Sequence, residues 1–303
     1  MNNNSRRKFL KRSAIVLTGS SLLSKLSFAN KIFEGEIMGI QLYSVRDDMK
    51  KDPLGTLKEL AEMGYKYVEH ANYVDRSFYG YAPNEFKKIL EDQGMKMLSG
   101  HTVLGPAHWN ESKDDFTDLW KDTVEDAAAV GQVYVISPSL DDKFRKDRES
   151  LLRFMEVFNK SGEYCKKFGM KFGYHNHDFE FRETIDGESV YDLILANTDP
   201  NLVIQQLDTG NLFNGGANAM EIVRKYPGRF LSIHVKDEIK QELDDRYEST
   251  ILGAGIAELT SLLDIVRTNS KGVHYIIEQE DYQDKTPLEC ASENYSIMKK
   301  WGF

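Results

Sequence analysis

Eight short runs rich in β-branched and aromatic residues alternate with longer runs of helical periodicity from Glu36 to the end of the chain. Runs of about four to eight such residues are typical of buried strands, and their alternation with helices is typical of a parallel α/β sheet. The predicted strands are Ile37–Ser44, Tyr67–Ala71, Lys96–Thr102, Val133–Ser137, Lys171–His177, Val203–Asp208, Phe230–Val235 and His274–Gln279.

The segments between these strands carry helix signals. Asp52-Pro53 and Thr286-Pro287 each place a capping side chain before a proline at the first helical position. Gly64 and Gly131 each follow a helical run and precede a strand, as helix-ending glycines do. The predicted helices are Leu54–Met63, Pro83–Gln93, Asp115–Val130, Arg148–Phe168, Val190–Ala196, Ala219–Lys225, Ile256–Thr268 and Pro287–Lys300.

This alternation predicts the fold class. Eight strand–helix units in roughly 270 residues fit a single (β/α)8 TIM barrel of the α/β class. A doubly wound sheet normally has fewer units, and no Gly-x-Gly-x-x-Gly turn follows the first predicted strand. Because no low-complexity linker divides the chain, we expect one barrel domain spanning residues 30–303.

Ionisable side chains gather where the predicted strands end. The active sites of TIM barrels lie at that end, on the loops that lead into the helices. The sequence therefore predicts a functional site built from strand-end residues: Glu69 and His70, His101, His175 to His177, Asp208, His234 to Asp237, and Glu278 to Glu280.

Asp208, His234 and Glu278 close the sixth, seventh and eighth predicted strands. Because neighbouring strands lie about 4.8 Å apart, inward side chains from adjacent strand ends can converge on one ion. The fifth strand adds His175 or His177, which alternation places on the same side. Imidazoles with carboxylates suit Mn, Fe, Co or Zn better than Mg or Ca. The sequence thus predicts one divalent metal ion, and a set of separate structural polar residues is the alternative.

Five segments at these strand ends resemble one known family, the sugar phosphate isomerase/epimerase family of xylose isomerase-like barrels. The resemblance covers nearly all of the chain from Glu36 to Phe303, and its segments are specific jointly rather than singly. They are Ile40–Ser44, Tyr174–Phe181, Leu207–Asn211, His234–Asp237 and Ile276–Glu278.

The resemblance implies a ligand set. Members of that family bind one divalent metal through Glu, Asp, His and Glu at the ends of strands five to eight. Carried over by position, Asp208, His234 and Glu278 match, and His175 replaces the first glutamate. Relatives use two metal-bound glutamates as opposed bases, so this chain keeps only Glu278 for that role.

The loss of one glutamate bears on catalysis. Isomerisation, epimerisation and β-elimination all begin with removal of a proton α to a carbonyl. Glu278 is the predicted base on one face of the substrate. His177, Lys236 and Glu180 are the candidates for the proton-transferring partner on the other face.

Further residues are expected to contact the substrate or to support the metal. His101, on the third strand, should face substrate hydroxyls across the barrel mouth, as should Glu180. Tyr43 and Trp109 are expected to stack on a sugar ring, as apolar walls commonly do in small-ligand sites. A separate pair, Asn176 and Asp237, is expected to orient the metal-binding imidazoles.

Residues 1–29 are predicted to be an export signal that is removed. The paired Arg6 and Arg7 precede the apolar run Ala14–Leu23, and Ser27-Phe28-Ala29 offers a small-x-small cleavage site. The pair resembles a twin-arginine signal, so the twin-arginine translocation machinery is an expected partner and the periplasm the expected location. The apolar run is shorter than the ~20 residues of a membrane span, so no stable span is predicted.

Charge and motif argue against a nucleic-acid enzyme. Removing the signal and its six basic residues takes the formal net charge from −9 to −15, which leaves no positive face for phosphates. The same barrel family contains apurinic endonucleases with an Asp-Thr-Cys-His motif, whereas this chain has Asp208-Thr209-Gly210-Asn211. The two cysteines, Cys165 and Cys290, lie in helical runs and are expected to be free buried thiols.

These observations favour an exported, metal-dependent carbohydrate isomerase or epimerase. Because phosphorylated sugars are confined to the cytoplasm, the expected substrate is a non-phosphorylated keto-sugar, inosose or keto-glycoside. A lyase or dehydratase acting on the same substrates is an alternative. A barrel that retains the metal and binds sugars without catalysis is another, and an oligomer is compatible with the sequence.

Overall fold

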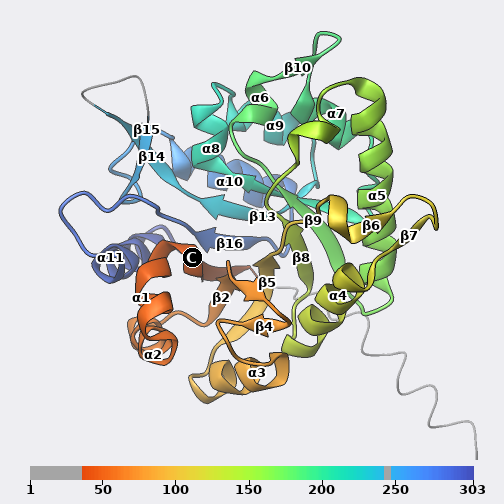
Figure 1. Ribbon diagram of the computed structural model, residues 1–303. Coiled ribbons are helices and arrows are strands. Elements are labelled where there is room, and N and C mark those ends of the chain that lie inside the picture. Colours follow the sequence, from red (N-terminus) through yellow and green to blue (C-terminus); the bar gives the residue numbers. More distant parts are fainter. Residues whose placement is uncertain (1–35, 242–246) are drawn as a thin grey trace, which may run out of the picture. The chain divides into compact units, whose positions relative to one another are not determined.

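The computed structural model describes residues 36–241 and 247–303, which fold around a closed eight-stranded parallel barrel (Figure 1). The strands are β1 Ile37–Gln41, β2 Tyr67–His70, β5 Lys96–His101, β8 Tyr134–Ser137, β9 Lys171–His175, β12 Val203–Asp208, β13 Phe230–Val235 and β16 His274–Ile277. They neighbour one another in that order, and β16 pairs with β1 to close the ring. The (β/α)8 barrel expected from the sequence is confirmed.

Helices follow the strands and cover the outside of the barrel (Figure 1). The longer ones are α2 Pro53–Met63, α3 Pro83–Asp92, α4 Asp118–Val130, α5 Arg148–Lys166, α7 Val190–Ala196, α9 Ala219–Lys225, α10 Leu259–Asn269 and α11 Pro287–Lys300. Shorter helical segments are η1 Leu42–Val45, α1 Arg46–Lys51, η2 Pro106–His108, η3 Asp142–Phe144, α6 Phe179–Arg182 and α8 Thr209–Asn214.

Four antiparallel hairpins extend the loops that follow barrel strands. Each of their strands is only two to four residues long, too short for the sequence pattern to reveal. They pair β3 Tyr73–Val74 with β4 Ser77–Phe78, β6 Trp109–Asn110 with β7 Asp115–Phe116, β10 Thr184–Ile185 with β11 Glu188–Ser189, and β14 Asp237–Lys240 with β15 Tyr247–Thr250.

The predicted element bounds agree with the structure to within two residues, apart from three ends that shift by three residues. The first strand ends at Gln41, whose side chain accepts a hydrogen bond from the Tyr43 amide and starts η1. The helix predicted from Asp115 begins at Asp118, because the two residues that open the predicted run pair in the β6–β7 hairpin. The helix predicted from Ile256 begins at Leu259.

The predicted helix starts at Asp52 and Thr286 are confirmed. The Asp52 side chain accepts from the Gly55 amide, and the Thr286 side chain accepts from the Glu289 amide. Both caps satisfy amides that the first helical turn leaves without an intrahelical partner.

Apolar and polar residues occupy different levels of the barrel interior. Tyr134, Ile136 and Ile204 form a small apolar cluster separate from the layer between sheet and helices. Gly173 lets this cluster close, since a Cβ there would lie 3.0 Å from both isoleucines. Polar side chains fill the interior beyond the apolar cluster, towards the C-terminal ends of the strands. The catalytic chemistry expected at that end therefore has a rigid apolar base.

Cys165 and Cys290 are free and buried, as expected. Within residues 36–241 and 247–303, no helix is long and apolar enough to cross a membrane. The predicted export signal, residues 1–29, lies outside the described residues.

Candidate metal centre

Four predicted ligands come from the C-terminal ends of four neighbouring strands. Asp208 of β12 and His234 of β13 are register partners, so their side chains share one face of the sheet. His175 of β9 lies opposite Gln206, two residues before Asp208 and therefore on the same face. Glu278 continues β16 by one residue. Parallel register thus delivers all four side chains to the mouth of the barrel.

The quartet of His175, Asp208, His234 and Glu278 is compact and buried. One possible ligand atom from each residue lies within 4.8 Å of the others. His234 Nδ1 is 2.9 Å from Glu278 Oε2 and 3.8 Å from Asp208 Oδ2, and His175 Nε2 is 4.0 Å from the same Asp208 oxygen. His177 is not a member of this group, to which the fifth strand contributes His175.

The quartet fits a divalent transition metal. Asp208 Oδ2 is buried and accepts no hydrogen bond from any described residue, although two imidazoles and a lysine surround it. A buried carboxylate oxygen is costly unless a cation faces it. The Lys236 ammonium faces Asp208 Oδ2 from 3.2 Å, and an ion held by the quartet would face the same oxygen. Two imidazoles with two carboxylates offer the mixed nitrogen and oxygen ligands that Zn, Mn, Fe and Co accept.

The two carboxylates of the quartet differ in their electrostatics. Burial raises the pKa of Asp208 to about 7, against the opposing effect of Lys236. Burial also acts to raise the pKa of Glu278, but His234 and Lys236 outweigh it and hold that pKa well below its ordinary value. Glu278 is therefore ionised at neutral pH and available as a base.

Lys236 supplies the positive charge beside the quartet. Its side chain is 2% exposed, and Nζ lies 2.7 Å from Glu280 Oε1, 3.2 Å from Asp208 Oδ2 and 3.1 Å from Asn211 Oδ1. Burial alone would lower the pKa of Lys236, but the surrounding carboxylates raise it well above its ordinary value. The amine is thus held as an ammonium ion, which can donate hydrogen bonds but cannot act as a base at neutral pH.

Two residues below the quartet, Glu69 and Gln206, contact its histidines; Glu69 was among the predicted strand-end residues without an assigned role, and Gln206 was not predicted. Gln206 Oε1 lies 3.0 Å from His175 Nδ1 and 2.6 Å from His101 Nε2. Glu69 Oε1 lies 2.6 Å from His234 Nε2. A signal was present in the sequence, because Gln206 precedes Asp208 by two residues on the same strand and so faces the same way.

The structure corrects the expectation that Asn176 and Asp237 orient the metal-binding imidazoles. Asn176 binds the backbone of Asp208 instead, donating to its carbonyl and accepting from its amide. Asp237 accepts from the amides of Gly253, Gly255 and Ala257, and so fixes the loop between β15 and α10. Both residues hold backbone, because each lies on the face of its strand end that points away from the histidines.

A second histidine group does not form an open site. His101, His175 and His234 also lie close enough to hold an ion. However, one nitrogen of each ring already faces an oxygen of Gln206 or Glu69 at 2.6 to 3.0 Å. The quartet therefore offers the better place for a metal among the described residues.

His177 lies beside the quartet, next to the rim. Its ring packs edge-on against His175, with centroids 5.3 Å apart, and parallel to Phe179. Its Nδ1 is buried and has no hydrogen-bond partner among the described residues. Burial lowers the pKa of His177, so the ring is neutral at pH 7. A neutral ring with a free nitrogen can accept or return a proton.

Glu180, expected to face substrate, is turned into the protein. Its side chain is fully buried, Tyr174 donates its hydroxyl to one oxygen, and the His177 amide donates to the other at 2.9 Å. Burial raises the pKa of Glu180 to about 7. The residue therefore positions the backbone of His177 and does not line the mouth.

The expected substrate contacts His101 and Tyr43 differ in exposure. The side chain of His101 is 11% exposed, and its ring stacks on that of His234 with centroids 5.1 Å apart. Tyr43 is 42% exposed in η1, and the Arg46 guanidinium lies over its ring. Arg46 also donates to the Tyr282 hydroxyl and to the Glu280 carbonyl. Tyr43 thus belongs to the rim, whereas His101 belongs mainly to the buried histidine cluster.

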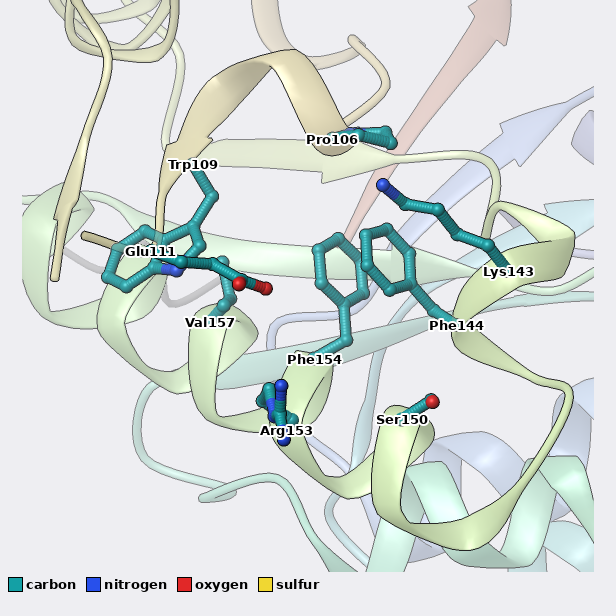
Figure 2. A pocket seen from close by; sticks show the side chains of 9 residues that line it. All are labelled: Pro106, Trp109, Glu111, Lys143, Phe144, Ser150, Arg153, Phe154 and Val157. Carbon is teal, nitrogen blue, oxygen red and sulfur yellow. The ribbon is translucent and has the colours of Figure 1, made fainter.

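Trp109 lies in a separate hollow of about 400 Å³ beside α5 (Figure 2). Figure 2 shows its ring and the stacked rings of Phe144 and Phe154 around this space, with Lys143 and Arg153 at the edge. None of the residues that line the hollow belongs to the quartet or to its hydrogen-bond partners. The β6–β7 hairpin carries Trp109 away from the histidine cluster.

Comparison with known proteins agrees with this geometry. The sequence model of the xylose isomerase-like TIM barrel family matches residues 57–301, which is most of the chain. The chain belongs to this family. The resemblance first seen in five strand-end segments is thereby confirmed.

Individual relatives are distant but cover most of the chain. An inosose dehydratase of Clostridium perfringens is 25% identical over 272 residues, covering 80% of this chain and 88% of the relative. A sugar phosphate isomerase/epimerase of Parabacteroides distasonis is 25% identical, with a TM-score of 0.76 over 88% of this chain and 94% of that chain. The IOLI protein, solved with a bound zinc atom, shares the fold at 13% identity and a TM-score of 0.67, covering 88% of this chain and 97% of that one.

Proposed function

We propose that the protein is a metal-dependent enzyme that removes a proton α to the carbonyl of a keto-sugar or related keto-polyol, and that it returns the proton to give an isomer or epimer. The observation that carries this proposal is the buried quartet of His175, Asp208, His234 and Glu278, with His177 beside it. The family and the sugar isomerases among its fold relatives support the substrate class.

The metal would be held by the quartet and would supply positive charge to polarise the substrate carbonyl. Its identity is proposed as Mn, Fe, Co or Zn, because the ligands mix imidazole and carboxylate. A relative of the same fold that was solved with zinc supports this choice.

Glu278 and His177 are proposed as the two proton-transferring groups. Glu278 is ionised and follows β16, whereas His177 is neutral and follows β9, with β12 and β13 between these strands. The two groups therefore reach the mouth from different sides. Lys236, held as an ammonium ion, would stabilise negative charge that develops on the substrate oxygen.

A second candidate function is loss of water from the same substrates. The two proposed proton-transferring groups are unlike, one carboxylate and one imidazole, so one can act as the base and the other as the acid of an elimination. Glu278 would take the α-proton, and the imidazolium form of His177, a minor form at pH 7 because its pKa is lowered, would protonate the departing hydroxide; Glu278 would then release its proton to water and His177 would take one up. The inosose dehydratases among the relatives support this alternative.

Product analysis in heavy water tests the proposal and separates these functions. Chelated protein reloaded with Co²⁺, Mn²⁺ or Zn²⁺ is incubated with keto-sugars, an inosose and keto-glycosides, and the products are followed by NMR and mass spectrometry. An isomer carrying deuterium at the α-carbon supports the first function, and a product lacking one water supports the second.

Saturable sugar binding without turnover would overturn both enzymatic proposals in favour of a binding protein. Two variants serve as controls for the assay. Glu278→Gln should abolish turnover, whereas Glu62→Gln, on an exposed face of α2, should not.

Export through the twin-arginine route is part of the proposed function, and it favours substrates without phosphate. Residues 1–29 carry the paired Arg6 and Arg7 and the cleavage site at Ala29. Replacing both arginines by lysine should trap the precursor in the cytoplasm. Normal periplasmic amounts of that variant, measured by cell fractionation, would contradict this route.

A further inference from the structure

We propose that Glu69 and Gln206, here termed the acceptor pair, are positioning residues that fix the tautomers of His175 and His234 so that the remaining nitrogen of each ring points to the metal. The inference rests on the metal centre of the proposed function, and it extends that centre to two residues outside the ligand set.

The orientation of Gln206 is fixed by its amide nitrogen. Gln206 Nε2 donates to Glu69 Oε2 at 2.9 Å and to Ser232 Oγ at 2.9 Å. The carbonyl oxygen, which can only accept, therefore points the other way, to His175 Nδ1 at 3.0 Å. Because Oε1 carries no hydrogen, the proton of this contact belongs to His175 Nδ1.

Glu69 plays the same part for His234. It is fully buried on β2, across the barrel from β13, and its carboxylate accepts hydrogen bonds from Gln41, Ser99 and Gln206. His234 Nε2 lies 2.6 Å from Glu69 Oε1, so this nitrogen carries a proton. Among the described residues, His234 and His101 are the basic side chains that lie beside Glu69, at 2.6 and 3.2 Å from Oε1.

Both contacts leave the nitrogen that faces Asp208 for the metal. A neutral imidazole with its proton on one nitrogen has its lone pair on the other. In His175 that nitrogen is Nε2, 4.0 Å from Asp208 Oδ2, and in His234 it is Nδ1, 3.8 Å from the same oxygen. Nδ1 of His234 also lies 2.9 Å from Glu278, so a proton shared there must leave when this ring binds an ion.

The arrangement explains why buried polar groups occupy the barrel interior directly beneath the quartet. Metal-bound histidines commonly donate their second N–H to a carboxylate or carbonyl, and removing that acceptor typically weakens metal binding 10–100-fold. Here an amide serves one histidine, a carboxylate serves the other, and the two acceptors bind each other. The pair thus couples both imidazoles into one network.

Two variants of the pair and one neighbour test the proposal. Gln206→Met removes the acceptor of His175, and Glu69→Met removes the acceptor of His234. The matched control is Gln205→Met, since Gln205 is the adjacent buried amide and has no partner for its side chain among the described residues. Co²⁺ affinity by chelator competition and the visible spectrum of bound Co²⁺ are measured for each.

We expect Co²⁺ affinity to fall about 10–100-fold in Gln206→Met and Glu69→Met, with an altered Co²⁺ spectrum, and to be unchanged in Gln205→Met. Equal affinity in all four proteins would overturn the proposal. If the wild-type protein binds no Co²⁺, the proposed metal centre fails, whereas the acceptor pair is still tested by the histidine tautomers.

Those tautomers are read by long-range ¹⁵N NMR of the chelated wild-type protein, which needs no variant to fold. The proposal expects a proton on His175 Nδ1 and one on His234 Nε2, in addition to any proton that His234 Nδ1 shares with Glu278 while the metal is absent. A His175 ring protonated on Nε2 alone would overturn it.

Discussion

Replacing Lys236 by methionine tests how the mouth of the barrel balances its charge. The Lys236 ammonium lies 2.7 Å from Glu280, 3.2 Å from Asp208 and 3.6 Å from Glu278, and the side chain is almost fully buried. Methionine keeps most of the aliphatic chain but leaves these carboxylates without that cation. Removing one partner of a buried ion pair costs about 3–5 kcal/mol, so we expect the free energy of unfolding of the chelated protein to fall by that amount.

A metal ion should recover part of the loss. A divalent cation in the quartet neutralises Asp208 and Glu278, two of the carboxylates that lost their partner. Lys236→Met should also bind Co²⁺ at least as tightly as the wild-type protein, because a like charge beside Asp208 has been removed. Urea unfolding followed by circular dichroism, with chelator and with Co²⁺, measures both effects.

The control for this experiment is Lys88→Met. Lys88 pairs with Asp92 on the exposed face of α3, and exposed pairs of this kind contribute little to stability. If Lys236→Met unfolds in chelator at the same urea concentration as Lys88→Met, the charge-balance argument is wrong. Weaker Co²⁺ binding by Lys236→Met would show that the ammonium ion supports the metal centre and does not compete with it.

Three further predictions follow from the same structure. Glu278→Gln should retain a measurable bound metal by elemental analysis while kcat falls by about 10²–10⁴-fold, since the amide cannot take a proton. The raised pKa of Glu180, about 7 against 4.5, makes its ionisation unfavourable in the folded protein. Glu180 should thus contribute up to about 3 kcal/mol to the fall in the free energy of unfolding between pH 4.5 and 7, and urea titrations of Glu180→Gln should show a fall that is smaller by this amount. Gly100→Ala should fold poorly, because its Cβ would lie within 2.0 Å of the buried His70 ring, and soluble yield with thermal unfolding checks this.

The amino-acid sequence alone determined the architecture. Strand and helix periodicities are properties of neighbouring residues, and the eight strand–helix units follow from them directly. The quartet could be predicted from the sequence for a related reason. Once the strands form a parallel barrel, all their C-terminal ends meet, so polar residues at those ends must lie near one another.

Only the tertiary structure decided which polar residues face the quartet and which serve the scaffold. Glu180 follows the fifth strand as a substrate contact would, yet Tyr174 and the His177 amide bind both of its oxygens inside the protein. Trp109 follows the third strand, yet a short hairpin turns it into a hollow of its own (Figure 2). Such placements depend on loops whose strands are too short to leave a periodic pattern.

The acceptor pair shows most clearly what the sequence alone does not predict. Glu69 and Gln206 are 137 residues apart and lie on strands that are not neighbours in the barrel. Alternation along β12 indicates that Gln206 points inward, and the same argument applies to Glu69 on β2. The sequence of neither strand determines the distance between the Glu69 and Gln206 side chains. That distance is set by closure of the barrel, which brings side chains from opposite strands across the interior to within hydrogen-bonding distance.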